Sequence, residues 1–115
     1  MSSKGPTGLF GTGRGGSVLP SNESQLNHIF GDRPGHLPDT LDNRQLLIDV
    51  ANDIDNYMGA DEHGNQWFVR LESDGSQIWV IVRDGIIQNG GRNKPPRTWD
   101  GSTGLSKNPY KGGQQ

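Results

Sequence analysis

The stretch "WFVRLESDGSQIWVIVRDGIIQN", residues 67–89, decides the fold, because two Asp-Gly pairs separate three runs of β-branched and aromatic residues. Asp-Gly between such runs is the strongest short-range signal for a β-hairpin. We therefore predict a three-stranded antiparallel meander. If both Asp-Gly pairs form two-residue loops, Leu71 faces Ile78 across the first turn and Val82 faces Ile87 across the second.

The alternation of side chains along a strand divides this meander into two faces. The expected core face consists of Trp67, Val69, Leu71, Ile78, Val80, Val82 and Ile87. The other face carries Phe68, Arg70, Trp79, Ile81, Arg83 and Ile86. Such aromatic and guanidinium groups can stack on bases and bind phosphates. They can equally form a second packing face, and both interpretations stay open here.

Two helices are expected before the meander. Ser21 or Asn22 is a suitable N-cap for a short helix that ends near Phe30. Asp39 or Thr40 is a suitable N-cap for a second helix. The apolar stripe of this second helix consists of Leu46, Leu47, Val50 and Ile54. The order of elements predicts an α+β domain with N-terminal helices packed on a small antiparallel β-meander.

The 115 residues suffice for one domain with a modest core. We expect residues 1–20 to form a flexible Gly-rich arm or linker, residues 21–104 the domain, and residues 105–115 a flexible tail. Gly59 and the turn at residues 61–65 should end the helical part. The longest apolar run, residues 78–82, is far too short to span a membrane, and we expect no signal peptide in this segment, because no basic-then-apolar stretch opens it.

The chain has no cysteine, which excludes disulfides, thiol nucleophiles and thiolate metal ligands. Its net charge of −2 conceals a segregation, because residues 39–82 are acidic and the chain from Arg83 onward is basic. A nucleic-acid surface needs local positive potential rather than a basic total. A solvated acidic helix beside a basic tail explains the same pattern.

Two of the three histidines, His28 and His36, lie eight positions apart on either side of a Gly/Pro turn. Imidazole changes its charge near neutral pH, so such a pair can share acid and base roles. We expect both rings to meet in one cleft, and two ordinary structural histidines are the alternative. A metal site would need Asp32 or Asp39 as well, but the spacing is not typical of metal ligands.

A second candidate segment, "NGGRNKPPRTW", residues 89–99, is expected to form a loop after the sheet. Its glycines allow tight backbone geometry, and backbone amides beside Arg92, Lys94 and Arg97 can bind an anion. A flexible basic turn without function is the other interpretation.

These segments resemble a known family. "HIFGDRPGH", residues 28–36, resembles the His-Ile-Phe opening and the following Gly-His of bacterial EndoU-type ribonuclease toxins. "GIIQNGGRNKPP", residues 85–96, resembles the C-terminal strands of the barnase/EndoU/colicin/RelE group. Residues 25–104 also resemble the C-terminal toxin tips of filamentous-haemagglutinin-like and contact-dependent inhibition proteins. The chain departs from the family by lacking the fuller Gly-Gly-His run of its second motif and by a shorter helix–strand spacing.

The resemblance implies a barnase/EndoU/colicin/RelE-like fold and metal-independent cleavage of RNA without a cofactor. His28 and His36 would serve as base and acid. The implied substrate contacts are Arg92 and Asn93 at the phosphate, Arg83, Arg97 and Thr98 as further candidates, and Trp79 stacked on an unpaired base.

The resemblance also implies tRNA as the substrate and a cognate immunity protein as a partner. A larger secreted or cell-surface protein would deliver the domain to the cytoplasm of a target bacterium. Two other function classes stay open. One is a non-enzymatic binding or adhesin-tip module, and the other is the metallohydrolase.

Overall fold

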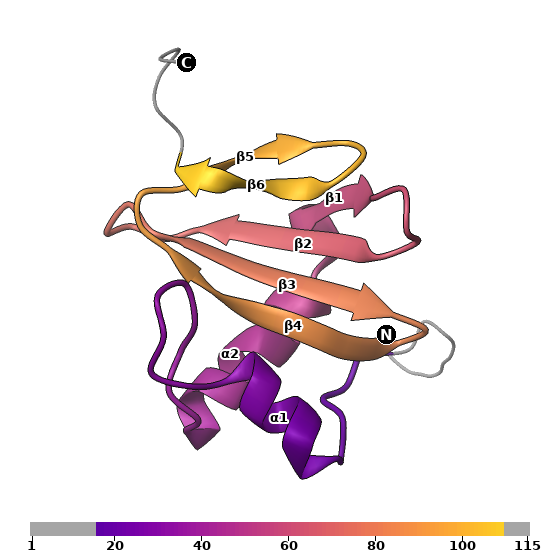
Figure 1. The fold of residues 1–115 in the computed structure, drawn as a ribbon, viewed down its shortest axis with the longest axis vertical. Helices are drawn as coiled ribbons and strands as arrows, with labels where there is room; N and C mark the ends of the chain where they lie inside the picture. The colour runs from indigo at the N-terminus through magenta and orange to yellow at the C-terminus, as the bar shows by residue number, and fades with distance from the viewer. Residues whose placement is uncertain (1–15, 110–115) are drawn as a thin grey trace.

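The computed structural model describes residues 16–109 and has the predicted α+β architecture (Figure 1). Helices α1 (Glu23–Ile29) and α2 (Leu41–Ala51) precede the strands, and a 3-10 helix, η1 (Ile54–Asn56), follows α2. An antiparallel sheet has the order β1-β2-β3-β4, with strands Tyr57–Ala60, Gln66–Leu71, Gln77–Arg83 and Ile86–Asn93. A second sheet pairs β5 (Arg97–Asp100) with β6 (Gly104–Pro109).

Both helices begin at caps that the sequence predicts. The Asn22 side chain accepts a hydrogen bond from the Gln25 amide, and Thr40 does the same for the Asn43 amide. Leu47 and Val50 of α2 are buried in the core. The fourth residue assigned to the stripe, Ile54, is 75% exposed. That assignment is wrong because α2 ends at Ala51, and the 3-10 turn does not continue the period of an α-helix.

The second hairpin forms as predicted, with Val82 opposite Ile87. Its loop is Asp84-Gly85, and both residues have positive φ, 54° and 77°, as a type I′ turn requires. The first hairpin differs from the prediction by one residue. The Glu72 amide donates to the Ser76 carbonyl at 2.8 Å, so the loop has three residues instead of two. Gly75 occupies its left-handed position, with φ 89°.

This extra loop residue reverses the two faces of β2. Leu71 pairs with Gln77, and Val69 pairs with Trp79. A shift of one residue moves every side chain of a strand to the opposite face. Phe68 therefore joins the core with Val80, whereas Leu71 is 66% exposed. The predicted core face is right for β3 and wrong for β2.

The two faces of the sheet are covered by different elements. Leu47 and Val50 of α2 pack with Val80 in the core on one face. On the other face the rings of Trp99 and Trp67 lie 6.0 Å apart, and Gly104 lies against Trp67. Figure 1 shows the β5–β6 hairpin at the opposite end of the view from the helices. The Trp-containing face is thus partly a second packing face.

Several strands lie where the sequence predicted none. Gly59, expected to end a helix, is in β1, and β4 continues to Asn93 through the first half of the expected basic loop. The folded part is also longer than residues 21–104. Val18, expected in the arm, pairs with Ile86, and β6 extends to Pro109. Residues 1–15 and 110–115 of the arm and tail lie outside the described residues. Within residues 16–109, no helix has the length and apolar character needed to cross a bilayer.

Candidate functional site

The loop at residues 31–37 folds back onto the C-terminal end of α1. The Arg33 guanidinium donates to the carbonyl oxygens of Asn27 and His28, and the Nδ1 atom of His36 lies 2.9 Å from the Ile29 carbonyl oxygen. The last carbonyls of a helix need such donors, because they have no partner within the helix. A neutral His36 therefore carries its proton on Nδ1, which leaves Nε2 as an acceptor.

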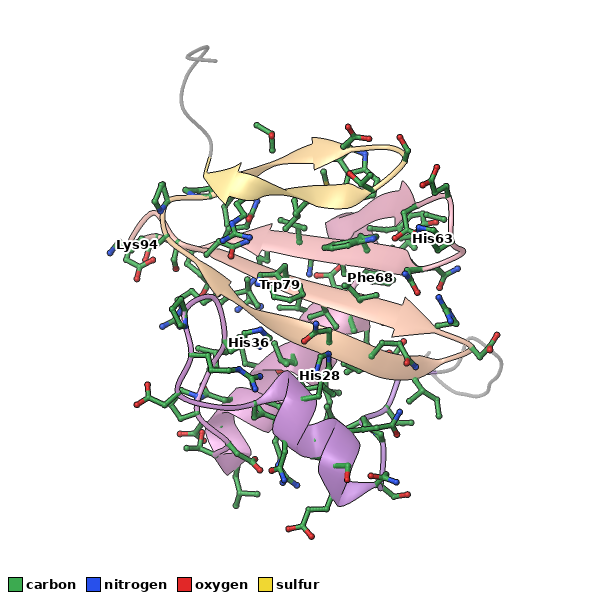
Figure 2. All side chains as sticks on the ribbon, viewed as in Figure 1. His28, His36, His63, Phe68, Trp79 and Lys94 are labelled. Carbon is green, nitrogen blue, oxygen red and sulfur yellow. The ribbon has the colours of Figure 1, made fainter. Side chains whose placement is uncertain are left out.

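The same loop is attached to the sheet at Gly35. Its carbonyl oxygen accepts from the Arg92 amide at 3.0 Å and from the Trp79 indole nitrogen at 3.3 Å. Gly91 lies against Gly35, so a Cβ atom at position 91 would collide with the Gly35 carbonyl oxygen. The His36 ring meets Trp79 edge-on, with 5.8 Å between ring centroids, and Trp79 stacks on Trp67 at 6.0 Å. Trp79 thus holds the His36 loop on the sheet (Figure 2).

His28 is exposed and lines a groove of about 390 Å³. The groove lies between α1 and the ends of β3 and β4, and it is lined by Ser24, Gln25, His28, Asn65, Ile81, Arg83, Gln88 and Asn89. None of these residues is a carboxylate. Arg83 is the one permanent charge among these lining residues.

A β-bulge shapes the floor of this groove. Ile81 pairs with Asn89, but the next residue, Val82, pairs with Ile87, so Gln88 is an extra residue in β4. In a regular strand, Gln88 and Asn89 would point to opposite faces. Because a bulge re-aims side chains, both of them line the groove.

The predicted acid/base pair is only partly brought together. His28, in the last turn of α1, and His36, at the Ile29 carbonyl, lie at the same end of that helix. His36 is half-buried and is not among the residues that line the groove. Of the proposed substrate contacts, Arg83 lies in the groove with His28.

The other predicted contacts lie elsewhere. The Asn93 amide is buried and donates to the Gln77 side-chain oxygen at 2.9 Å, and the same oxygen accepts from the Arg97 amide at 3.0 Å. Arg92 is exposed and pairs with Ile78, and Thr98 lies in β5. Gln77 and Arg83 are the two ends of β3, about 20 Å apart for six residue steps.

Three of these predicted contacts thus lie at the opposite end of the sheet from Arg83: Arg92 and Asn93 at the end of β4, and Arg97, whose amide donates to Gln77. Thr98 belongs to the second sheet. In Figure 2, Lys94 lies near the end of the sheet that carries Arg92, and His63 lies near the end that carries Arg83. Arg92 and Lys94 lie near Asp74, whose pKa is lowered mainly by hydrogen bonds from Ser76 and further by these two cations.

Asp61 does not line the groove, but it bonds to Asn65, which does. No pattern in the sequence marked Asp61 as a site residue. Burial alone would raise its pKa, but four hydrogen bonds lower the pKa to about 2. These come from the Trp67 indole at 3.0 Å, from the His63 and Asn65 amides, and from the Asn65 side chain at 3.2 Å. Asp61 thereby fixes Asn65 at the edge of the groove.

The sequence-based prediction of the site did not include the carboxamide residues Gln25, Asn65, Gln88 and Asn89. The available signal was the polar pair Gln88-Asn89, which interrupts the apolar alternation directly after Ile86 and Ile87. The metallohydrolase hypothesis finds no ligand set here, since residues 16–109 gather no group of three histidine or carboxylate side chains suited to a metal ion.

Comparison of the chain with protein-family models, curated proteins and solved structures finds no match.

Proposed function

We propose that this protein is an endoribonuclease that cleaves single-stranded RNA by acid/base transesterification, without a metal ion or cofactor. One observation carries the proposal. His28 and Arg83 line a carboxylate-free groove, and His36 lies at the end of the helix that carries His28. A phosphodiester needs these groups: a cation for its charge and imidazoles for its protons.

In the proposed reaction, a neutral imidazole takes the proton of a ribose 2′-hydroxyl. The 2′-oxygen then forms a bond to the adjacent phosphorus, and the bond from phosphorus to the 5′-oxygen breaks. A protonated imidazole gives its proton to that 5′-oxygen, so the products are a 2′,3′-cyclic phosphate and a 5′-hydroxyl. Arg83 stabilises the charge that builds up on the phosphate oxygens. The base role of His36 comes from the sequence resemblance, because its ring does not line the groove; its Nδ1 bond to the Ile29 carbonyl leaves Nε2 as an acceptor, as a base requires.

The finer parts of the proposal come from the sequence resemblance. We infer a barnase/EndoU/colicin/RelE-like domain that acts as a toxin against competing bacteria, with tRNA as its substrate. We further infer delivery by a larger secreted or cell-surface protein and inhibition by a cognate immunity protein. The order of two helices followed by an antiparallel sheet supports this assignment.

The test is cleavage of end-labelled RNA by purified protein in the presence of EDTA. The variants His28→Ala and Arg83→Gln should each lose activity, about 10²- to 10⁴-fold for the histidine. His63→Ala and Arg92→Gln are matched controls outside the groove, and both should keep the activity. DNA should stay intact, since it lacks the 2′-hydroxyl. A requirement for metal, or linear 3′-hydroxyl products, would contradict the mechanism.

The physiological substrate needs a second experiment, the sequencing of RNA ends from cells that express the domain. Cuts at one position of a few tRNAs would support the tRNA assignment. Scattered cuts through messenger RNA would contradict it and leave the chemistry intact.

A further inference from the structure

We propose that the His28 groove is a base-reading subsite for an unpaired adenine, and that Arg83 lies between it and a second nucleoside subsite. The inference rests on the proposed function and extends it, because it states how the strand lies on the protein and which base is preferred. Its evidence is separate from the histidines.

Carboxamide side chains dominate the first groove. Four of its eight lining residues are Asn or Gln: Gln25, Asn65, Gln88 and Asn89. A carboxamide presents a donor and an acceptor side by side, which matches the neighbouring amino group and ring nitrogen of adenine. A site for phosphate alone would need cations instead, and this groove has only Arg83 as a permanent cation.

Three of these carboxamides are held in place by the protein. Asn89 Oδ1 accepts from the Gly90 amide at 3.0 Å, and Gln88 Nε2 donates to the Ile86 carbonyl at 3.1 Å. The Asn65 side chain donates to Asp61 at 3.2 Å. Among the hydrogen bonds of residues 16–109, none involves Asn89 Nδ2, so this nitrogen can donate to a ring nitrogen while the second lone pair of Oδ1 accepts from an amino group. Groups already fixed in this way lose little conformational entropy on binding.

The half-buried Ile81 supplies an apolar contact surface for the plane of a base. The bulge at Gln88 is the second, independent observation. It interrupts the ladder of β4 where regular pairing would turn Gln88 away from the groove. Its effect is to place two adjacent carboxamides on one side of the strand.

A second groove of about 340 Å³ adjoins the first. Gln25, Arg83 and Gln88 line both grooves and therefore form the divide between them. Pro20 and Ile86 give the second groove an apolar part, and Asp84 contributes the one carboxylate of its lining. Two nucleosides in neighbouring grooves are joined by a phosphate that crosses this divide, where the Arg83 guanidinium is. His28 lies one helical turn from Gln25 on the same side of α1 and lines the first groove.

The experiment measures kcat/KM for short single-stranded oligoribonucleotides that differ at one position, with wild-type protein, Asn89→Ala, Arg83→Gln and Gln45→Ala. Gln45, an exposed carboxamide of α2, is the matched control. Wild-type protein should prefer adenine. Asn89→Ala should lower kcat/KM for the adenine substrate roughly fivefold to 150-fold and abolish the preference. Arg83→Gln should lower kcat/KM by the same factor for all substrates. Equal losses for every base in Asn89→Ala, or no preference in wild-type protein, would overturn the subsite.

A binding measurement separates this inference from the proposed function. Dinucleotides with a 2′-deoxyribose cannot be cleaved, and NMR shifts of the Asn89 side-chain amide report their binding directly. If wild-type protein cleaves no RNA but these shifts saturate with a preference for adenine, the groove assignment holds and the ribonuclease proposal fails. If RNA is cleaved and the Asn89 amide does not respond to any dinucleotide, the ribonuclease proposal holds and the base subsite is refuted.

Discussion

Gly91 is the residue at which a single methyl group tests the site most sharply. In Gly91→Ala, the new Cβ would overlap the Gly35 carbonyl oxygen and approach His36 Cα to 3.0 Å. Gly91 lies in the interior of β4 and Gly35 in the loop, so we expect the loop to be the part that moves. A normal carbon–oxygen contact requires a displacement of about 1 Å or more.

The energetic consequences follow from the contacts of Gly35. A shift of this size breaks its hydrogen bonds from the Arg92 amide and the Trp79 indole. Each is worth about 1 kcal/mol, so stability should fall by roughly 1–3 kcal/mol. His36 moves with its neighbour, and a misplacement of about 1 Å in the base that we propose should lower the rate of cleavage about 10²-fold.

Two other glycines of the chain supply the controls. In Gly90→Ala the Cβ would meet the Leu47 side chain at 2.8 Å, on the core face, and the Trp79 backbone oxygen at 3.0 Å, but no atom of the His36 loop, so stability should fall and activity should change less than in Gly91→Ala. In Gly101→Ala nothing lies within 4 Å, and both properties should be unchanged. The assays are thermal unfolding and RNA cleavage at a temperature where all variants are folded. If Gly91→Ala is as active as Gly90→Ala, the position of the His36 loop does not matter for catalysis.

Three further predictions concern His36, Asp61 and the partner. His36→Asn keeps a donor for the Ile29 carbonyl but removes the base, so cleavage should fall at least about 100-fold at a nearly unchanged melting temperature; full activity would make His36 a helix cap only. The pKa of Asp61 is about 2 against its ordinary 3.8, so the ionised carboxylate should add roughly 2 kcal/mol to the free energy of unfolding above pH 4. This contribution is lost as the pH falls through 2. Denaturant unfolding should therefore show Asp61→Asn less stable than wild type at pH 7, with the difference vanishing near pH 2; an equal difference at both pH values would refute this. An acidic protein encoded beside the gene should bind the groove tightly and restore growth to cells expressing the domain, and Arg83→Gln should slow its association.

The sequence predicts those parts of the fold that depend on local signals. Asn22 and Thr40 cap the helices because their side chains bond the next backbone amides, and Asp84-Gly85 sets the second hairpin. The faces of β2 were not predictable from the Asp-Gly pair at residues 74–75. The same dipeptide fits a two-residue and a three-residue loop, and the difference of one residue exchanges the faces.

Elements stabilised by tertiary contacts gave no comparable signal. The sequence of β1 contains Gly59, which is unfavourable in an isolated strand, and its place is explained by Trp99, which lies over it. The β5–β6 hairpin likewise depends on Trp99 and Gly104 packing on Trp67. Such contacts join residues more than thirty positions apart, which no local pattern reports.

Some residues of the candidate site could likewise be selected from the sequence, and others could not. His28 and Arg83 could be selected from the sequence, because imidazole and guanidinium groups suit the chemistry of a phosphodiester. The carboxamides could not, since Asn and Gln are common on any surface. Their convergence depends on the bulge at Gln88 and on the bonds that Asp61 makes to Asn65.

The free edge of β4 explains why the groove forms at α1. Val18, before the helix, bonds to Gly85 and Ile87 at one end of this edge, and Gly35, after the helix, accepts from Arg92 at the other. Both segments flanking α1 are therefore tied to the same strand, which protects an edge that would otherwise be open to pairing. The helix between them has to lie along β4. The spacing of His28 from Arg83 is thus set by backbone hydrogen bonds on both sides, and the acid/base catalysis that we propose requires such a fixed geometry.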